Sequence, residues 1–197
     1  MVTVTGSSDW FTEDTTMRAR DIPNLITFGR IVLVAPVTWA LLKGHYSLAL
    51  VLFFVAGFSD ALDGFLAKQF DWSSRLGALL DPLADKVLLI SCYAALAWTG
   101  FLPFWLLALV VLRDVVIVTG AILYNYRVER LDAHPTLVSK LNTFLQIVLV
   151  LLVIVHEASG YGETRWIDWL VYAVTASIVW SGVDYVITWG RRARNHS

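Results

Sequence analysis

The sequence predicts an all-α integral membrane protein with six transmembrane helices. Of its 197 residues, 57% are hydrophobic, and the mean hydropathy of +0.65 is high. Soluble domains are usually about half apolar or less. The apolar residues form runs of span length rather than the alternating pattern of a membrane β-barrel. A helix satisfies its own backbone hydrogen bonds in lipid, so six helices are expected.

Six stretches are each long and apolar enough to be a candidate span of about 20 residues. In chain order they are residues 24–43, 46–68, 76–99, 102–126, 136–156 and 166–189. Short polar or turn-forming segments separate them in the same order: KGH, DWSS, TGFLP, RVERLDAHP and EASGYGETR. These segments are rich in Gly, Pro, Ser and charged residues, which favour loops over helices.

The basic residues predict the orientation. If both termini lie on one side, that side holds Arg18, Arg20, Lys68, Arg75, Arg127, Arg130, Arg191, Arg192 and Arg194, and the other side holds Lys43 and Arg165. The positive-inside rule then places both termini in the cytoplasm. The expected organisation is a cytoplasmic or interfacial segment (1–23), a membrane domain (24–189) and a basic cytoplasmic tail (190–197).

The chain ends and overall charge give further expectations. Residues 8–22 are expected to form a short interfacial helix or, equally, a frayed tail. No signal or transit peptide is visible, which favours a bacterial inner membrane. The single cysteine, Cys92, excludes an internal disulfide. The net charge of −1 indicates no particular charged partner, and no nucleic-acid partner is expected.

Four aspartates interrupt this apolar sequence. Asp60 and Asp63 lie late in the second predicted span, and Asp81 and Asp85 lie early in the third. All four should reach a similar depth near the cytoplasmic face, with each pair on one helical face. Carboxylates there are costly unless they are compensated. A hard divalent cation, such as Mg²⁺ shared with substrate phosphates, compensates them well.

The same carboxylates are also compatible with a structural or a transport role. In a structural role they would pair with Lys68, Arg75 and Lys86 as ion pairs. In a transport role they would line a proton or ion pathway through the membrane.

Other polar residues occur at compatible depth. They are Arg30 in the first span, Arg113 beside Asp114 in the fourth, and Lys140 and Asn142 in the fifth. Together they suggest cationic groups around a cavity that holds phosphate or the acceptor. Arg113 and Asp114 could equally be a structural ion pair, and Arg30 and Lys140 could snorkel to the interface.

The stretch DALDGFLAKQFDWSSRLGALLDPLAD, residues 60–85, resembles the signature of the CDP-alcohol phosphotransferase family, D-x2-D-G-x2-A-R-x8-G-x3-D-x3-D. Seven of its eight fixed positions match, with every gap of the right length: Asp60, Asp63, Gly64, Ala67, Gly77, Asp81 and Asp85. The departure is Lys68, where the family has arginine. Lysine keeps the charge but lacks the bidentate fork.

This resemblance implies an enzyme that transfers a substituted phosphate from a CDP-linked donor to an alcohol and releases CMP. It implies that Asp60, Asp63 and Asp81 bind divalent metal, Mg²⁺ or Mn²⁺ and two ions per site. It implies that Asp85 is both a metal ligand and the general base. Gly64, Ala67, Lys68 and Gly77 would surround the cytidine diphosphate together with the first three aspartates. Family members are homodimers of six-helix protomers, so a homodimer is expected.

Four shorter sequence segments resemble particular branches of this family and so indicate the acceptor alcohol. The strings IPNLITFGRIVL and LGALLDPLADKVLL look like the branch that makes phosphatidylglycerol phosphate and cardiolipin. The strings VLRDVVIVTGAILYNYR and PTLVSKLNTFLQIVLV look like the eukaryotic-type cardiolipin synthases. The resemblance therefore implies CDP-diacylglycerol as donor, phosphatidylglycerol as acceptor and membrane lipids around the protein. The alternative acceptor is glycerol 3-phosphate, which would make the chain a phosphatidylglycerol phosphate synthase.

Overall fold

The computed structural model describes residues 22–70, 75–127, 137–160 and 165–194. Within these ranges it describes no side chains for residues 22–25, 61, 63–81, 121–137 and 184–194. The predicted interfacial helix at residues 8–22 therefore lies, apart from its last residue, outside the described residues.

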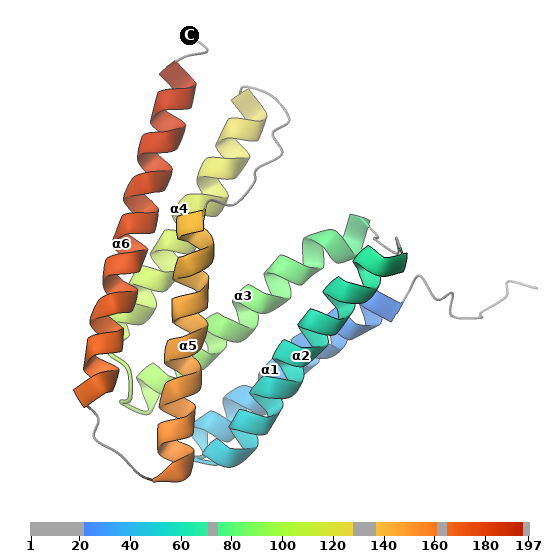
Figure 1. The fold of residues 1–197 in the computed structure, drawn as a ribbon, viewed down its shortest axis with the longest axis vertical. Helices are drawn as coiled ribbons and strands as arrows, with labels where there is room; N and C mark the ends of the chain where they lie inside the picture. The colour runs from blue at the N-terminus through green and yellow to red at the C-terminus, as the bar shows by residue number, and fades with distance from the viewer. Residues whose placement is uncertain (1–21, 71–74, 128–136, 161–164, 195–197) are drawn as a thin grey trace, which may run out of the picture.

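Six α-helices make up the described chain, which contains no strand, and this confirms the all-α prediction. They are α1 (Ile22–Leu42), α2 (Tyr46–Phe70), α3 (Arg75–Trp98), α4 (Phe104–Arg127), α5 (Leu137–Ser159) and α6 (Arg165–Arg194). Each coincides with one predicted span to within a few residues. Consecutive helices run in opposite directions along the bundle (Figure 1).

Two tight turns use glycine in the left-handed region of backbone conformation. Residues that carry a side chain are strained there, whereas glycine is not. Gly44, with φ 74°, ends α1, and Gly100, with φ 87°, ends α3. At the first turn the amide of His45 donates to the carbonyl of Ala40 at 2.9 Å, and the amide of Gly44 donates to that of Leu41 at 3.2 Å. This is the Schellman arrangement, which satisfies the last carbonyls of a helix and reverses the chain at once.

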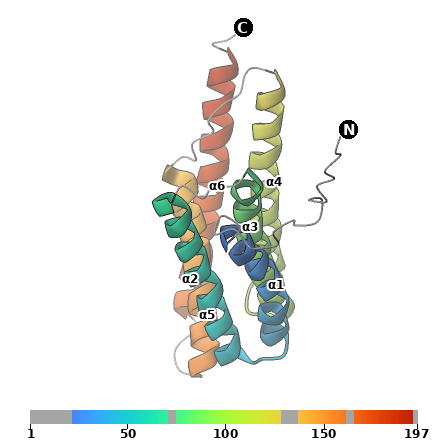
Figure 2. The ribbon, with the colours of Figure 1, turned by 90° about the vertical axis from the view of Figure 1, so that its right-hand side faces the viewer.

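The helices pack as two groups that share one core. Helix α1 packs against α2 and α3, while α6 packs against α4 and α5. Contacts of α2 with α5, and of α3 with α4 and α5, join the groups, and Figures 1 and 2 show α2 and α5 side by side. Small buried residues such as Ala49, Ala56, Cys92 and Ala95 let the backbones approach closely.

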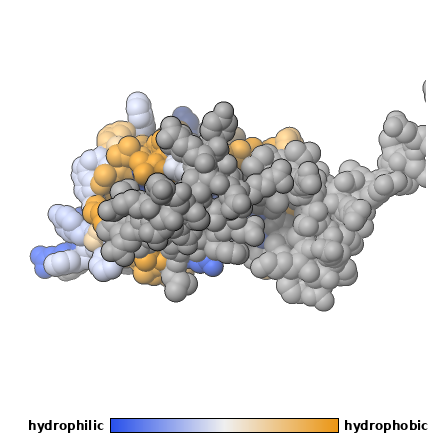
Figure 3. Space-filling model, turned by 90° about the horizontal axis from the view of Figure 1, so that it is seen from above, coloured by the Kyte–Doolittle hydropathy of each residue, from blue (hydrophilic) through white to orange (hydrophobic). Residues whose placement is uncertain are grey.

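The outer surface carries many large apolar side chains. Hydrophobic residues reach the surface in Figure 3. Of the five exposed tryptophans among the described residues, Trp180 lies midway along α6 and the other four lie at the end of the bundle that holds the α1–α2, α3–α4 and α5–α6 connections: Trp39, Trp98, Trp105 and Trp169. Tryptophan is enriched where a membrane meets water, so this end has the composition of an interfacial belt.

By length and hydropathy, two of the described helices support the predicted crossing of a membrane. The stretches Val138–Ser159 and Arg165–Val183 are long and apolar enough to cross a membrane, and Ile26–Leu42 and Tyr46–Asp60 are shorter apolar helices. Six helices are therefore established within the described residues, while six membrane spans remain a prediction.

Candidate active site

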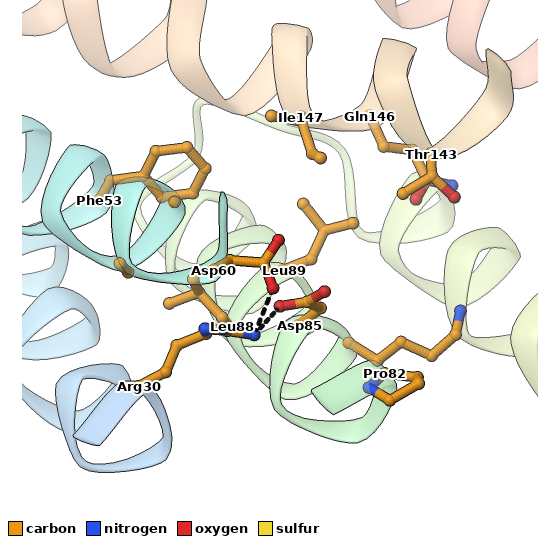
Figure 4. A pocket seen from close by; sticks show the side chains of 13 residues that line it. Arg30, Phe53, Asp60, Pro82, Asp85, Leu88, Leu89, Thr143, Gln146 and Ile147 are labelled. Atoms are coloured by element: carbon orange, nitrogen blue, oxygen red, sulfur yellow. Dashed lines mark hydrogen bonds and ion pairs between the residues drawn. The ribbon is translucent and has the colours of Figure 1, made fainter. Parts of the chain in front are cut away.

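A cavity of about 290 Å³ lies between α1, α2, α3 and α5 (Figure 4). Its polar and charged lining comes from all four helices: Arg30, Asp60, Asp85, Lys86, Thr143 and Gln146. The rest of its lining is small or apolar: Phe53, Ala56, Gly57, Pro82, Leu88, Leu89 and Ile147. The cavity thus combines charged and apolar groups, and both α2 and α3 contribute residues of each kind.

Two motif carboxylates converge on one guanidinium in this cavity. Arg30 Nη1 lies 2.8 Å from Asp60 Oδ1 and 2.5 Å from Asp85 Oδ1. Figure 4 shows both carboxylates pointing toward the tip of Arg30. Because both oxygens contact one nitrogen, they lie close together although 25 positions of sequence separate them.

The packing of α1 against α2 and α3 explains this convergence. Asp60 lies past the middle of α2 and Asp85 before the middle of α3, and these antiparallel helices bring both to one level. Arg30 reaches that level from the first half of α1. The Arg30 side chain is 1% exposed, whereas those of Asp60 and Asp85 are 45% and 49% exposed. The arginine is therefore built into the wall, and the carboxylates face the open cavity.

A second polar cluster ties the other helices together. Arg113 of α4 donates through Nη1 to Asp114 at 2.8 Å, and through Nη2 to Ser139 of α5 at 2.6 Å and Ser181 of α6 at 2.9 Å. Lys86 Nζ lies 2.5 Å from Asp114 Oδ2. This cluster connects the cavity wall on α3 to three further helices.

Of the four residues predicted to contact a phosphate or the acceptor, the structure places one, Arg30, at the cavity. Arg30 lines the cavity with Asp60 and Asp85, whereas Arg113, Lys140 and Asn142 are not among the described residues that line it. Lys140 is exposed. Asn142 is buried, and its Oδ1 accepts a hydrogen bond from Ser177 of α6 at 2.8 Å. Contacts of these three residues with a phosphate stay predictions.

At six motif positions the structure describes the backbone alone: Asp63, Gly64, Ala67, Lys68, Gly77 and Asp81. Their backbone belongs to α2 and α3. Of the basic residues that the sequence offers as structural partners of the aspartates, Lys86 contacts Asp114. Asp60 and Asp85 instead contact Arg30.

The two described carboxylates, Asp60 and Asp85, fit a divalent cation. Asp60 and Asp85 already share one positive group, and carboxylate oxygens are the ligands that Mg²⁺ and Mn²⁺ prefer. Within the described side chains no group of three acidic, histidine or cysteine residues could hold a metal. The predicted ligands Asp63 and Asp81 fall outside that part of the chain.

Sequence reasoning missed several cavity residues. Gln146 and Thr143 stand on α5 across from the aspartates, and Lys86, which the sequence offers only as an ion-pair partner of the aspartates, also lines the cavity. A weak signal existed for Gln146, because it is a polar residue one helical turn after Asn142 in an otherwise apolar run. The apolar lining residues carry no sequence signal that separates them from ordinary core residues.

Known proteins resemble this chain along most of its length. It is 30% identical to a cardiolipin synthase (CMP-forming) of Rattus norvegicus, covering 79% of this chain and 58% of that protein. It is 34% identical to the chloroplastic CDP-diacylglycerol–glycerol-3-phosphate 3-phosphatidyltransferase 1 of Oryza sativa, covering 85% and 58%. It is 31% identical to a probable phosphatidylglycerophosphate synthase of Mycobacterium tuberculosis, covering 86% and 81%.

The chain thus spans little more than half the length of the rat and rice relatives. The sequence profile of the CDP-alcohol phosphatidyltransferase family matches residues 20–181, which include the whole cavity and the aspartate motif. With this match over most of its length, the chain belongs to the CDP-alcohol phosphatidyltransferase family.

Proposed function

We propose that this protein transfers a phosphatidyl group from CDP-diacylglycerol to phosphatidylglycerol, forming cardiolipin and releasing CMP. The observation that carries the proposal is the convergence of Asp60 and Asp85 in a cavity that is also lined by large apolar side chains. Such a cavity suits a reaction in which a charged phosphate and a lipid must meet.

Asp85 is the proposed general base. Its carboxylate takes the proton of the acceptor hydroxyl while the hydroxyl oxygen attacks the phosphorus that carries diacylglycerol. The bond from that phosphorus to the CMP oxygen breaks, and CMP leaves with the bonding electron pair. The 49% exposure of the Asp85 side chain gives a hydroxyl in the cavity access to it.

Arg30 has a positioning role in this proposal. Its buried guanidinium contacts both carboxylates and fixes their spacing before substrate enters. The family is generally dependent on divalent metal. We propose Asp60, Asp63, Asp81 and Asp85 as the residues that would hold Mg²⁺ or Mn²⁺, which when bound neutralises the diphosphate and stabilises the attacking and leaving oxygens. Gly64, Ala67, Lys68 and Gly77 would surround the cytidine diphosphate.

The proposed setting is a bacterial inner membrane, with both termini and the cavity toward the cytoplasm. Supporting observations are the apolar exterior and the exposed tryptophans at the far end of the bundle. The basic residues at the opposite end support the orientation. A homodimer, the assembly expected from the family resemblance, belongs to the same proposal.

Glycerol 3-phosphate is the second candidate acceptor. The similarity to the rice and mycobacterial proteins favours it, while the similarity to the rat protein favours phosphatidylglycerol. The apolar lining by Phe53, Leu88, Leu89 and Ile147 favours a lipid acceptor over a soluble dianion.

The deciding experiment is an acceptor competition with purified protein in liposomes. CDP-diacylglycerol and Mg²⁺ are supplied with either phosphatidylglycerol or glycerol 3-phosphate, and CMP and the lipid product are measured by mass. Cardiolipin made from phosphatidylglycerol alone supports the proposal. Phosphatidylglycerol phosphate made from glycerol 3-phosphate replaces it with the second candidate. Ion flux without any CMP would favour a transporter instead.

A further inference from the structure

Gln146 of α5 is a buried amide at the cavity wall. Its side chain is 2% exposed and lines the cavity with Asp60 and Asp85. Its Nε2 makes no hydrogen bond to any of the described residues. Figure 4 shows it beside Thr143 on α5, across the cavity from the helices that carry the two aspartates.

An amide nitrogen in this position is costly unless it finds an acceptor. Leaving a buried donor without a partner costs about 1–3 kcal/mol, and most buried polar groups in folded proteins are satisfied. The turn that carries Gln146 is held in place, because the hydroxyl of Tyr93 donates to the Gln146 backbone carbonyl at 3.3 Å. A ligand oxygen in the cavity can supply the missing acceptor.

The position of α5 indicates which substrate supplies that oxygen. The CDP-linked donor is expected on the motif helices α2 and α3, together with Asp60 and Asp85. In phosphoryl transfer the attacking and leaving oxygens lie roughly in line across the phosphorus. The wall formed by Thr143, Gln146 and Ile147 faces the motif helices across the cavity, and therefore lies on the side from which an acceptor arrives.

We infer that Gln146 is a specificity-determining residue whose Nε2 donates a hydrogen bond to an oxygen of a glycerol phosphate ester, the acceptor of the reaction. This inference rests on the proposed function. The glycerol phosphate ester can come from phosphatidylglycerol or from glycerol 3-phosphate, because both present a glycerol hydroxyl beside a phosphate.

The test is Gln146→Met in the full-length protein. Methionine keeps the length and shape of glutamine but has no N–H donor. The KM for the acceptor should rise about five- to tenfold while the KM for CDP-diacylglycerol stays within about twofold, since one hydrogen bond is lost. Without acceptor, the melting temperature should stay the same or rise, because an unsatisfied buried group has been removed.

A binding measurement makes the test independent of turnover. Short-chain phosphatidylglycerol and glycerol 3-phosphate are each added to metal-free protein in detergent, and the rise in melting temperature is recorded. The wild-type protein should be stabilised by its acceptor, and Gln146→Met should be stabilised less at the same concentration. Leu145→Met is the matched control, because Leu145 packs against the core of the bundle.

Each outcome of these measurements either supports or overturns the inference that Gln146 binds the acceptor. An unchanged acceptor KM, a rise in the donor KM instead, or a lower melting temperature with an unchanged acceptor response would overturn it. If Gln146→Met does not fold, Gln146→Glu removes the same donor and should weaken acceptor binding more strongly. The product made by the wild-type protein separately tests the proposed function, so failure of one does not imply failure of the other.

Discussion

Arg30 Nη1 and Asp85 Oδ1 lie 2.5 Å apart, although Arg30 is in α1 and Asp85 is in α3. The same nitrogen also contacts Asp60. A residue outside the aspartate motif therefore contacts two motif carboxylates at once, as the positioning role proposed for Arg30 requires.

Arg30→Lys should lower the rate of CMP release by about 10- to 100-fold, because hydrogen bonds to charged groups contribute ~1.5–3 kcal/mol. Lysine keeps the charge, but its compact ammonium does not reproduce the planar guanidinium that contacts both carboxylates. Turnover and melting temperature would be measured on the same preparation. Wild-type turnover in this variant would show that the spacing does not depend on the guanidinium.

Asp85→Asn should lower CMP release by about 10²–10⁴-fold, the usual contribution of a general base. The amide is nearly isosteric with the carboxylate and Asp60 still contacts the buried Arg30, so the protein should fold with a modestly lower melting temperature. Asp168→Asn is the matched control, because Asp168 is exposed in the first turn of α6, near the opposite end of the bundle. Near wild-type turnover in Asp85→Asn would refute its role as base.

Chelation of divalent metal should stop turnover, and added Mg²⁺ or Mn²⁺ should restore it, since the proposed ligands are carboxylates. The variant Asp60→Asn should need a higher Mg²⁺ concentration for half-maximal turnover, because one charged ligand is lost. CMP release would be followed during metal titration of both proteins. Turnover that persists through exhaustive chelation would contradict the metal proposal.

Arg113→Met should destabilise the protein more than it affects acceptor binding. Arg113 is 6% exposed, and its terminal nitrogens contact Asp114, Ser139 and Ser181. Removing one partner of a buried ion pair costs about 3–5 kcal/mol. A lower melting temperature with an acceptor KM within about twofold would indicate a structural role. A large rise in the acceptor KM at unchanged melting temperature would indicate the phosphate contact predicted from the sequence.

The same cluster permits a double-substitution check. In Arg113→Met with Asp114→Leu, both charges disappear together, so no unpaired carboxylate of the pair stays buried. The double variant should therefore be less destabilised than the sum of the two single variants. Lys86, which also contacts Asp114, should become more mobile in this variant.

The sequence predicts the six helices well because apolar runs separated by Gly, Pro and charged residues are strong local signals. It also predicts that Asp60 and Asp85 share one level, because their distances from the α2–α3 connection are similar. It does not predict the partner of these carboxylates. Arg30 is distant in the chain, and only the packing of α1 against α2 and α3 brings it to them.

Gln146 and Arg113 show how little a single polar residue in the sequence reveals about its partners. The sequence leaves Arg113 as either a phosphate ligand or the ion-pair partner of Asp114, and in the structure its terminal nitrogens donate to Asp114, Ser139 and Ser181. The sequence assigns no role to Gln146, yet this residue lines the cavity and its buried Nε2 has no hydrogen-bond partner among the described residues. Helical periodicity gives the face of a residue, but which neighbouring helix covers that face depends on tertiary packing.

The cavity draws its walls from separate parts of the chain: acidic groups from α2 and α3, and the amide wall from α5. If Gln146 binds the acceptor as inferred above, substitutions on α5 alter the choice of alcohol while the acidic groups on α2 and α3 stay in place. Under that proposal, relatives with one donor and different lipid products would differ most in the cavity-facing residues of α5.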